Sequence, residues 1–276
     1  MPDLIGENSY SKKCNLKLKG GGMENLKVKR FTSDSKEINT ALNSLRSSSM
    51  LDSFSKHKKC PPNMFCQFCL LRSIIFRINL PKGRQAIMPL EVECQSIITE
   101  NITETEVLSS VLDNACNSFP AFADTIKPQW RCLCCQNMKS NDGKSIITLD
   151  SEAKNREISD LLNTKYNTIK EEHLKEALNH VVCHDTNFEM ILQNGHKSCA
   201  FSSSENLELD LEEILRFGGK SWQCVGVISN LEESYFKVEK KWFVSSENKK
   251  EIEICKNFKI KNGCVAIYDE INIEDS

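Results

Sequence analysis

The sequence predicts an α+β protein in which helices of the first half pack on an antiparallel sheet formed by the second half. Apolar residues recur at helical spacing up to about residue 119, whereas short β-rich or alternating segments dominate after residue 186. Helices followed by strands favour an α+β fold over alternating βαβ units. With 276 residues, the chain is long enough for one large domain or two small ones with a substantial core.

Charge and composition exclude several classes of protein. Lys and Arg number 36 against 38 Asp and Glu, giving a net charge of −2, whereas nucleic-acid binding normally needs an excess of basic residues. No apolar run reaches about 18 residues, and residues 1–30 lack the apolar stretch of a secretory signal. We therefore expect no nucleic-acid or membrane partner and a cytoplasmic or nuclear location, where the 14 cysteines are thiols or metal ligands.

Three helices are predicted in the first half, after a basic tail. Residues 1–30 are rich in Lys and Gly without any helical or strand period, which indicates a flexible segment. Residues 36–54 place apolar side chains near helical spacing, and residues 68–78 form a second apolar helix that Pro81 ends. Residues 90–119 show the same helical pattern. We expect these helices to bury one face each.

Strands are predicted to begin after residue 128. Residues 130–135 and 145–149 are expected to form two short strands joined by a turn at 141–143, whose Asn-Asp-Gly sequence favours chain reversal. Residues 151–184 return to polar helices with apolar inward faces. The remaining strands are predicted at residues 188–192, 222–228, 234–238, 241–244 and 265–268.

The first candidate metal site lies between the first two predicted helices. His57 and Cys60 are followed by Cys66 and Cys69, which form a Cys-x-x-Cys pair. Such a pair can direct two thiolates at one ion, and a third thiolate and an imidazole complete a tetrahedral zinc shell. The alternative is that Cys66 and Cys69 are small apolar residues packed in the core, since free Cys is often buried.

A second candidate zinc site contains Cys132 and Cys135. These two residues again form a Cys-x-x-Cys pair, on what the pattern predicts to be a hairpin knuckle, but no matching second pair follows. The alternatives are a vestigial site or plain packing. The candidates for the remaining ligands are Cys183, His184, His196 and Cys199.

The run at residues 36–45 resembles the first sequence box of the ubiquitin-specific proteases, a family of cysteine deubiquitinases (peptidase C19). In that box, Cys, an aromatic residue, any residue and Asn lead into Leu-Gln-x-Leu. Asn39, Leu42 and Leu45 match it, and Asn43 replaces the Gln. The following Cys-rich turn is similar to that of one subgroup of the family. Residues 130–149 resemble the family's fingers hairpin, in which a Cys-x-x-Cys pair precedes an aliphatic strand.

The C-terminal third resembles the last strands of the same family. The matching pieces are residues 222–228, 234–235, 241–243 and 266–268. The resemblance covers about residues 31–272, following the tail at 1–30. It implies a papain-like arrangement of a helical thumb at about 31–120, short fingers at about 121–185 and a palm sheet at about 186–272. In active relatives the fingers hold the globular part of ubiquitin.

The residues that the resemblance places at the catalytic positions cannot perform the family's chemistry. A cysteine protease needs a thiolate, a His that deprotonates it and an Asp or Asn that orients the His. Here the nucleophile position is Lys36, the general-base position is Ser234 and the orienting position is Ser246, while the oxyanion position is Phe31. The sequence therefore predicts that the chain is not an enzyme.

A shifted alignment does not restore the triad. No Cys lies between Cys14 and Cys60, and no His follows His196. The resemblance thus implies an inactive member that acts as a protein-binding or scaffold module, with ubiquitin, a ubiquitin-like protein or another protein as its partner. The alternatives are a zinc-stabilised interaction domain unrelated to ubiquitin, and an active hydrolase that uses other residues.

Overall fold

A computed structural model defines the fold of the protein. The predicted tail at residues 1–30, together with His57 and Cys60 of the first candidate metal site, lies outside the residues that it describes. These are residues 36–50, 66–78, 103–140, 143–150, 157–177, 183, 188–191, 198–203, 208–229, 233–238, 240–246, 252–255 and 262–271.

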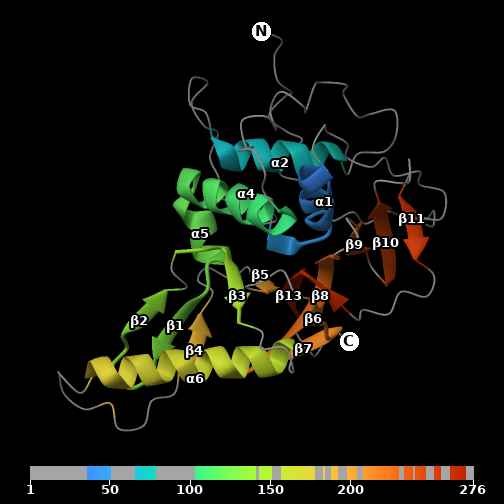
Figure 1. Ribbon diagram of the computed structural model, residues 1–276. Helices are drawn as coiled ribbons and strands as arrows, with labels where there is room; N and C mark the ends of the chain where they lie inside the picture. The colour runs from blue at the N-terminus through green and yellow to red at the C-terminus, as the bar shows by residue number, and fades with distance from the viewer. Residues whose placement is uncertain are drawn as a thin grey trace.

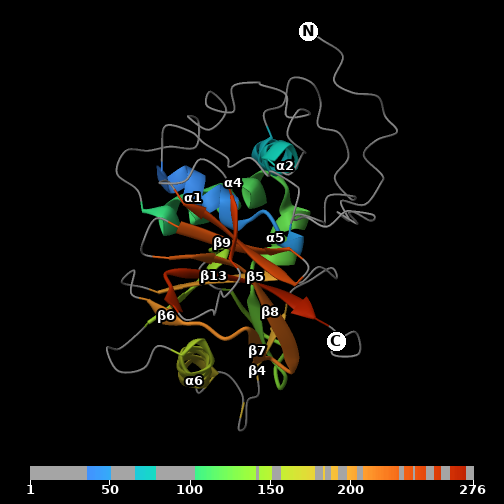
Figure 2. The same cartoon turned by 90° about the vertical axis from the view of Figure 1, so that its right-hand side faces the viewer.

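The helices lie on both sides of a central sheet (Figures 1 and 2). On one side are α1 (Lys36–Ser44), α2 (Gln67–Ile78), α4 (Glu104–Ser118) and α5 (Pro120–Ile126), and on the other is the long helix α6 (Ile158–Ala177). Within the described segments, no helix is both long enough and apolar enough to traverse a lipid bilayer.

The described strands form three sheets, of which the central one has eight strands. Its order is β11 (Glu253–Cys255), β10 (Lys241–Ser246), β9 (Glu233–Val238), β8 (Lys220–Ile228), β13 (Val265–Ile271), β5 (Ser198–Ser203) and β3 (Ile146–Leu149), with β7 (Ile214–Phe217) paired to β8. The smaller sheets are β2 (Met138–Ser140), β1 (Gln129–Cys132) and β4 (Phe188–Ile191), and the pair β12 (Asn262–Gly263) and β6 (Leu209–Asp210). Every pairing is antiparallel except that of β3 with β5. The predicted α+β class is confirmed.

The central sheet is buried on both faces, so alternate residues of its strands enter two different cores. Ile146 and Ala200 pack with the N-terminal helices, whereas their neighbours Ile147 and Phe201 pack with α6. This alternation is the period-two geometry of a strand. It explains why these strands do not divide into one apolar and one polar face.

The first helix is shorter than its apolar period predicts. The prediction extends it to residue 54, but α1 ends at Ser44. The serine-rich run after it bonds to the sheet instead: the Ser47 hydroxyl donates to the Val225 carbonyl at 2.8 Å, and the Ser49 amide donates to the Asp269 carboxylate at 2.7 Å. Such bonds compete with the helical ladder and stop it.

The predicted hairpin of residues 130–135 and 145–149 is wrong in its pairing. Strand β1 pairs with β2, at residues 138–140, whereas β3 joins the central sheet parallel to β5. The residues of β3 (Ile-Ile-Thr-Leu) are mostly buried, as expected for a parallel strand covered on both faces. The chain between β2 and β3 therefore connects two sheets rather than two strands of one hairpin.

Other predicted elements differ in extent. Thr103 caps α4 with a reciprocal bond to Glu106, so α4 begins at residue 104, and residues 90–102 of the predicted helix lie outside the described residues. Helix α5, which starts with Pro120, was not predicted, and residues 158–177 form one helix. The five predicted strands of the last third are confirmed, but β5, β6, β7, β11 and β12 were not predicted.

Helix α1 rests directly on the sheet at Gly226. A methyl group at Gly226 would collide with the backbone carbonyl oxygen of Ser44 and come within 3.2 Å of the Ile267 side chain. Because backbone cannot rotate away as a side chain can, only glycine permits this approach. Arg46 continues the contact, with its guanidinium 5.3 Å from the centre of the Phe236 ring.

A buried carboxylate anchors the chain immediately after α1. Asp269 in β13 accepts hydrogen bonds from the Ser198 hydroxyl at 2.6 Å, the Ser48 hydroxyl at 3.1 Å and the Ser49 amide. Burial raises the pKa of Asp269, and the hydrogen bonds from these serines offset only part of that effect. The network joins β5, β13 and the segment that follows the helix.

We expect Gly226→Ala to destabilise the protein by about 3 kcal/mol, because the added methyl group forces α1 away from the sheet. Gly219→Ala is the control, since a methyl group there meets no atom within 4 Å and the cost comes only from its φ of 73°. That cost should be about 1 kcal/mol. Urea unfolding would measure both changes, and equal effects would contradict the predicted contact.

We expect Asp269→Asn to change how stability depends on pH. Because the folded pKa lies above the unfolded value, the wild-type protein loses stability as pH rises from about 4 through the folded pKa. The amide can bond to the same serines without a charge, so this variant should gain stability relative to wild type between pH 4 and pH 7. Urea unfolding at both values measures the difference. If Asp269→Asn instead destabilised the protein more at pH 7 than at pH 4, the fold would favour the charged carboxylate, and the raised pKa of Asp269 would be contradicted.

Candidate metal centre

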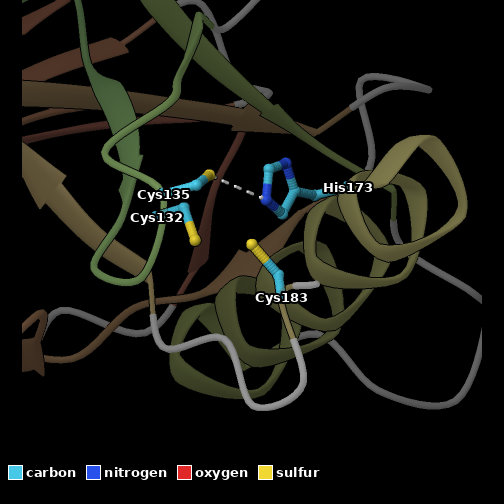
Figure 3. A group of neighbouring side chains, drawn as sticks. All are labelled: Cys132, Cys135, His173 and Cys183. Atoms are coloured by element: carbon cyan, nitrogen blue, oxygen red, sulfur yellow. Dashed lines mark hydrogen bonds between the residues drawn. The ribbon is translucent and has the colours of Figure 1, made fainter. Parts of the chain in front are cut away.

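The centre begins with a sharp turn between β1 and β2. Strand β1 ends at Cys132, and the Cys132 amide donates to the Asn137 carbonyl at 3.0 Å while the Gln136 amide donates to the Cys132 carbonyl at 2.9 Å. Gln136 has a φ of 63°, in the left-handed region, which costs a non-glycine residue about 1 kcal/mol. The turn places the side chains of Cys132 and Cys135 on one side of the hairpin (Figure 3).

Helix α6 supplies an imidazole from its inward face. Ile158, Leu162 and Ile169 lie along this face, and His173 continues it one turn beyond Ile169. His173 is only 3% exposed, an unusual burial for a polar residue in a helix rich in Lys and Glu. The ring points toward the hairpin, and its Nε2 atom lies 3.4 Å from the Cys135 sulfur (Figure 3).

Cys183 completes the cluster from the chain between α6 and β4. Its side chain is 8% exposed and points into the space between the hairpin and α6 (Figure 3). One sulfur from each of Cys132, Cys135 and Cys183 and one nitrogen of His173 all lie within 4.8 Å of one another. Three thiols and an imidazole thus converge on one point.

This geometry fits a zinc ion. With Zn–S and Zn–N bonds of about 2.3 and 2.05 Å, tetrahedral ligands stand about 3.6 to 3.8 Å apart. The 3.4 Å separation between the Cys135 sulfur and the His173 nitrogen is close to that value. A set of three thiolates and one imidazole suits zinc better than the oxygen-preferring Mg²⁺ or Ca²⁺. Cys132, Cys135, His173 and Cys183 can therefore bind a zinc ion.

The surroundings lower the pKa of one thiol of the cluster and raise the pKa of another. Burial acts to raise the pKa of Cys132, but the backbone amides of Cys135 and Cys134 donate to its sulfur and lower the pKa overall. Burial and the neighbouring thiols raise the pKa of Cys183 to about 12. A divalent cation replaces these protons, so binding of zinc should release protons and weaken in acid.

The second predicted zinc site is thus assembled with a different ligand set. Cys132 and Cys135 meet Cys183, which was one of the candidate partners, and His173, which was not predicted. Cys199 lies in β5, where it is paired opposite Tyr268, while His184 and His196 fall outside the described residues. The available signal for His173 was its position one helical turn after Ile169, on the same face of α6.

The first predicted zinc site stays a prediction. Cys66 is 8% exposed and belongs to the core formed by the N-terminal helices, and Cys69 packs against that core. These positions agree with the alternative of apolar packing for the two cysteines.

The three positions at which the resemblance implies a catalytic triad lie on elements that contact one another. Lys36 is the exposed first residue of α1, and α1 packs against β8, β9 and β10. Ser234 in β9 is paired opposite Ser245 in β10, next to Ser246, so both positions lie at the same end of neighbouring strands. Ser234 is fully buried, and its hydroxyl has no hydrogen-bond partner among the described residues.

Comparison with solved structures identifies the fold. A chain of the SAGA Ubp8/Sgf11/Sus1/Sgf73 DUB module aligns with a TM-score of 0.60 and 9% identity, over 94% of this chain and 71% of that chain. The same module bound to monoubiquitin gives 0.57 and 10%, over 90% and 69%. An essential yeast splicing factor gives 0.56 and 10%, over 86% and 67%. The chain has a ubiquitin-specific-protease-like fold.

Sequence comparisons add no closer relative. No protein-family model matches the chain, and no curated protein sequence matches it.

We expect His173→Ala to lower zinc affinity by more than about 100-fold, since loss even of a residue that merely orients a ligand costs 10 to 100-fold. Glu172→Ala is the control, because it makes the same change at an exposed neighbouring position of α6. Zinc content by mass spectrometry and competition with a chelator would measure the affinity. Circular dichroism would confirm that α6 still forms. Unchanged zinc binding in the His173 variant would contradict the ligand set.

Proposed function

We propose that this chain is a catalytically inactive protein of ubiquitin-specific-protease-like fold that works as a protein-binding or scaffold module, with ubiquitin or a ubiquitin-like protein as the first candidate partner. One observation carries the proposal. The positions expected for the nucleophile, base and orienting residue lie on α1, β9 and β10, which contact one another, and they hold Lys36, Ser234 and Ser246.

None of these three side chains can replace a cysteine triad. A Lys ammonium group cannot form the thioester of a cysteine protease. A Ser hydroxyl becomes nucleophilic only beside a base, and the buried Ser234 hydroxyl has no hydrogen-bond partner among the described residues. The sequence has no His after His196, so neither β9 nor β10 carries a general base of that type. These facts support a role in binding rather than hydrolysis.

A candidate binding surface lies at the hairpin of β1 and β2, in the region expected to form the fingers. Leu133 is 45% and Met138 is 42% exposed, and both belong to this hairpin. They are two of the three large apolar side chains that are exposed among the described residues, and the third, Ile214, lies on β7. The similar DUB module is described in complex with monoubiquitin, which supports ubiquitin as the first partner to test.

The alternative is a zinc-stabilised interaction domain that does not bind ubiquitin. The convergence of Cys132, Cys135, His173 and Cys183 supports zinc as a structural element in either case. A protein described as a splicing factor has a similar fold, which supports roles other than ubiquitin cleavage. With either function, we propose a cytoplasmic or nuclear location, where thiols remain reduced and available to zinc.

We expect no covalent adduct with a ubiquitin carrying a C-terminal vinyl sulfone, because the positions expected for the nucleophile and the base hold Lys36 and Ser234 in place of a thiol and an imidazole. Titration of isotope-labelled ubiquitin with the protein should shift a contiguous set of ubiquitin resonances. Adduct formation that one Cys→Ser variant abolishes would overturn the inactive assignment. Absence of any shift would favour the domain unrelated to ubiquitin.

The surface itself can be tested with charged variants. Combining Leu133→Asp with Met138→Asp should weaken ubiquitin binding by about tenfold or more, because central apolar contacts carry most binding energy. Ile214→Asp is the matched control, since Ile214 is 49% exposed but lies on β7. Equal losses in the two variants would assign the contact to another surface.

A further inference from the structure

The three thiols of the metal centre differ in their access to solvent. Cys135 is exposed, whereas Cys132 and Cys183 are buried. Cys135 lies in the turn between β1 and β2, where Leu133 and Gln136 are exposed as well. Oxidation of cysteine follows accessibility and thiolate character, and a cysteine bound to a metal is a thiolate. A soluble oxidant therefore reaches the Cys135 sulfur before the other two.

Cys132 is the best placed partner for Cys135 in a disulfide. The ligand sulfurs of the two residues lie within 4.8 Å of each other. The turn that holds both residues is closed by a hydrogen bond of 2.9 Å from the Gln136 amide to the Cys132 carbonyl. Their Cys-x-x-Cys spacing is also that of the redox-active pair in disulfide oxidoreductases. Cys183 comes from another segment of the chain, so a bond to it needs two segments to stay in place.

We infer that Cys135 is a site of reversible oxidation, at which a disulfide with Cys132 releases the zinc ion, an inference that rests on the metal centre described above. The Cys135 thiolate attacks one oxygen of a hydroperoxide, the O–O bond breaks, and the sulfur becomes a sulfenic acid. The Cys132 thiolate then attacks that sulfur and displaces hydroxide. With hydrogen peroxide, two thiolates, one peroxide and two protons give one disulfide and two waters, and two electrons pass from sulfur to oxygen.

The disulfide removes two of the four ligands at once. One thiol and one imidazole remain, from Cys183 and His173, which are too few for the closed shell of a structural zinc ion. The hairpin of β1 and β2 then loses its metal link to α6. The exposed Leu133 and Met138 belong to this hairpin, so oxidation acts on the binding surface proposed above. A dithiol breaks the disulfide and restores the ligands.

The test uses the full-length zinc-loaded protein and hydrogen peroxide. Zinc release is followed with a chromogenic chelator, and mass spectrometry of peptides maps the disulfides. The wild-type protein should release zinc in step with formation of the Cys132–Cys135 disulfide. A dithiol with added zinc should then restore the zinc-bound state.

The variant Cys135→His separates the two roles of this residue, because an imidazole can bind zinc but cannot form a disulfide. It should release zinc on the order of tenfold more slowly than the wild-type protein. Cys183→His is the matched control, since it makes the same change at another ligand and leaves Cys132 and Cys135 in place. It should release zinc at close to the wild-type rate.

Release at the wild-type rate from Cys135→His would overturn the inference, as would a wild-type disulfide that contains Cys183 in place of the Cys132–Cys135 bond. If either variant fails to bind zinc, the disulfide map of the oxidised wild-type protein decides: the Cys132–Cys135 bond supports the inference, and its absence contradicts it. Wild-type protein that never takes up zinc would instead contradict the metal centre. That result differs from zinc-loaded protein that keeps its metal in peroxide, which contradicts the oxidation site alone.

Discussion

The close approach of helix α1 to strand β8 fixes the geometry of the whole N-terminal layer. Gly226 has no side chain, and the Ser44 carbonyl occupies the space that a methyl group would need. Arg46, Ser47 and the serines that bond to Asp269 follow at once, so the end of the helix is bound to β9, β8 and β13 in turn. Helix α1 also contacts β9 and β10, which carry Ser234 and Ser246. The close approach at Gly226 therefore helps to hold α1 beside these two strands.

Apolar packing holds the elements around α1 together. At the other end of the molecule, the zinc ligands can hold the hairpin against α6. The sheet of β1, β2 and β4 has strands of only three or four residues, too short for independent stability. Trp130 adds contacts with Tyr166 and Phe217, at ring-centre distances of 6.4 and 5.5 Å. A metal that joins the hairpin, α6 and Cys183 closes a long stretch of chain, and its binding energy adds directly to folding.

The sequence predicts those parts of this arrangement that depend on local chemistry. The Cys-x-x-Cys pair at Cys132 and Cys135 was found because its spacing can direct two thiolates at one ion. His173 was missed because its neighbours are Lys and Glu, and its meaning comes only from the face that it shares with Ile169. The overlong first helix and the misassigned hairpin fail for one reason: hydrogen bonds to distant strands outweigh local periodicity. Pairing between β3 and β5 joins residues about 54 apart, and no turn motif encodes it.

The buried hydroxyl of Ser234 connects the fold to the proposed loss of catalysis. A buried polar group without a hydrogen bond costs on the order of 1 to 3 kcal/mol, so this position does not improve stability. Nor can it serve hydrolysis, since nothing described around it accepts its proton. A residue such as Ser234, which aids neither stability nor hydrolysis, is tolerable if the protein functions by binding through its surface. The exposed Leu133 and Met138 lie on the hairpin that the zinc ligands hold, far along the chain from Ser234. Binding would then depend on the integrity of the metal centre and not on Lys36, Ser234 or Ser246. The separation of these two dependences would distinguish a binding module from a damaged enzyme.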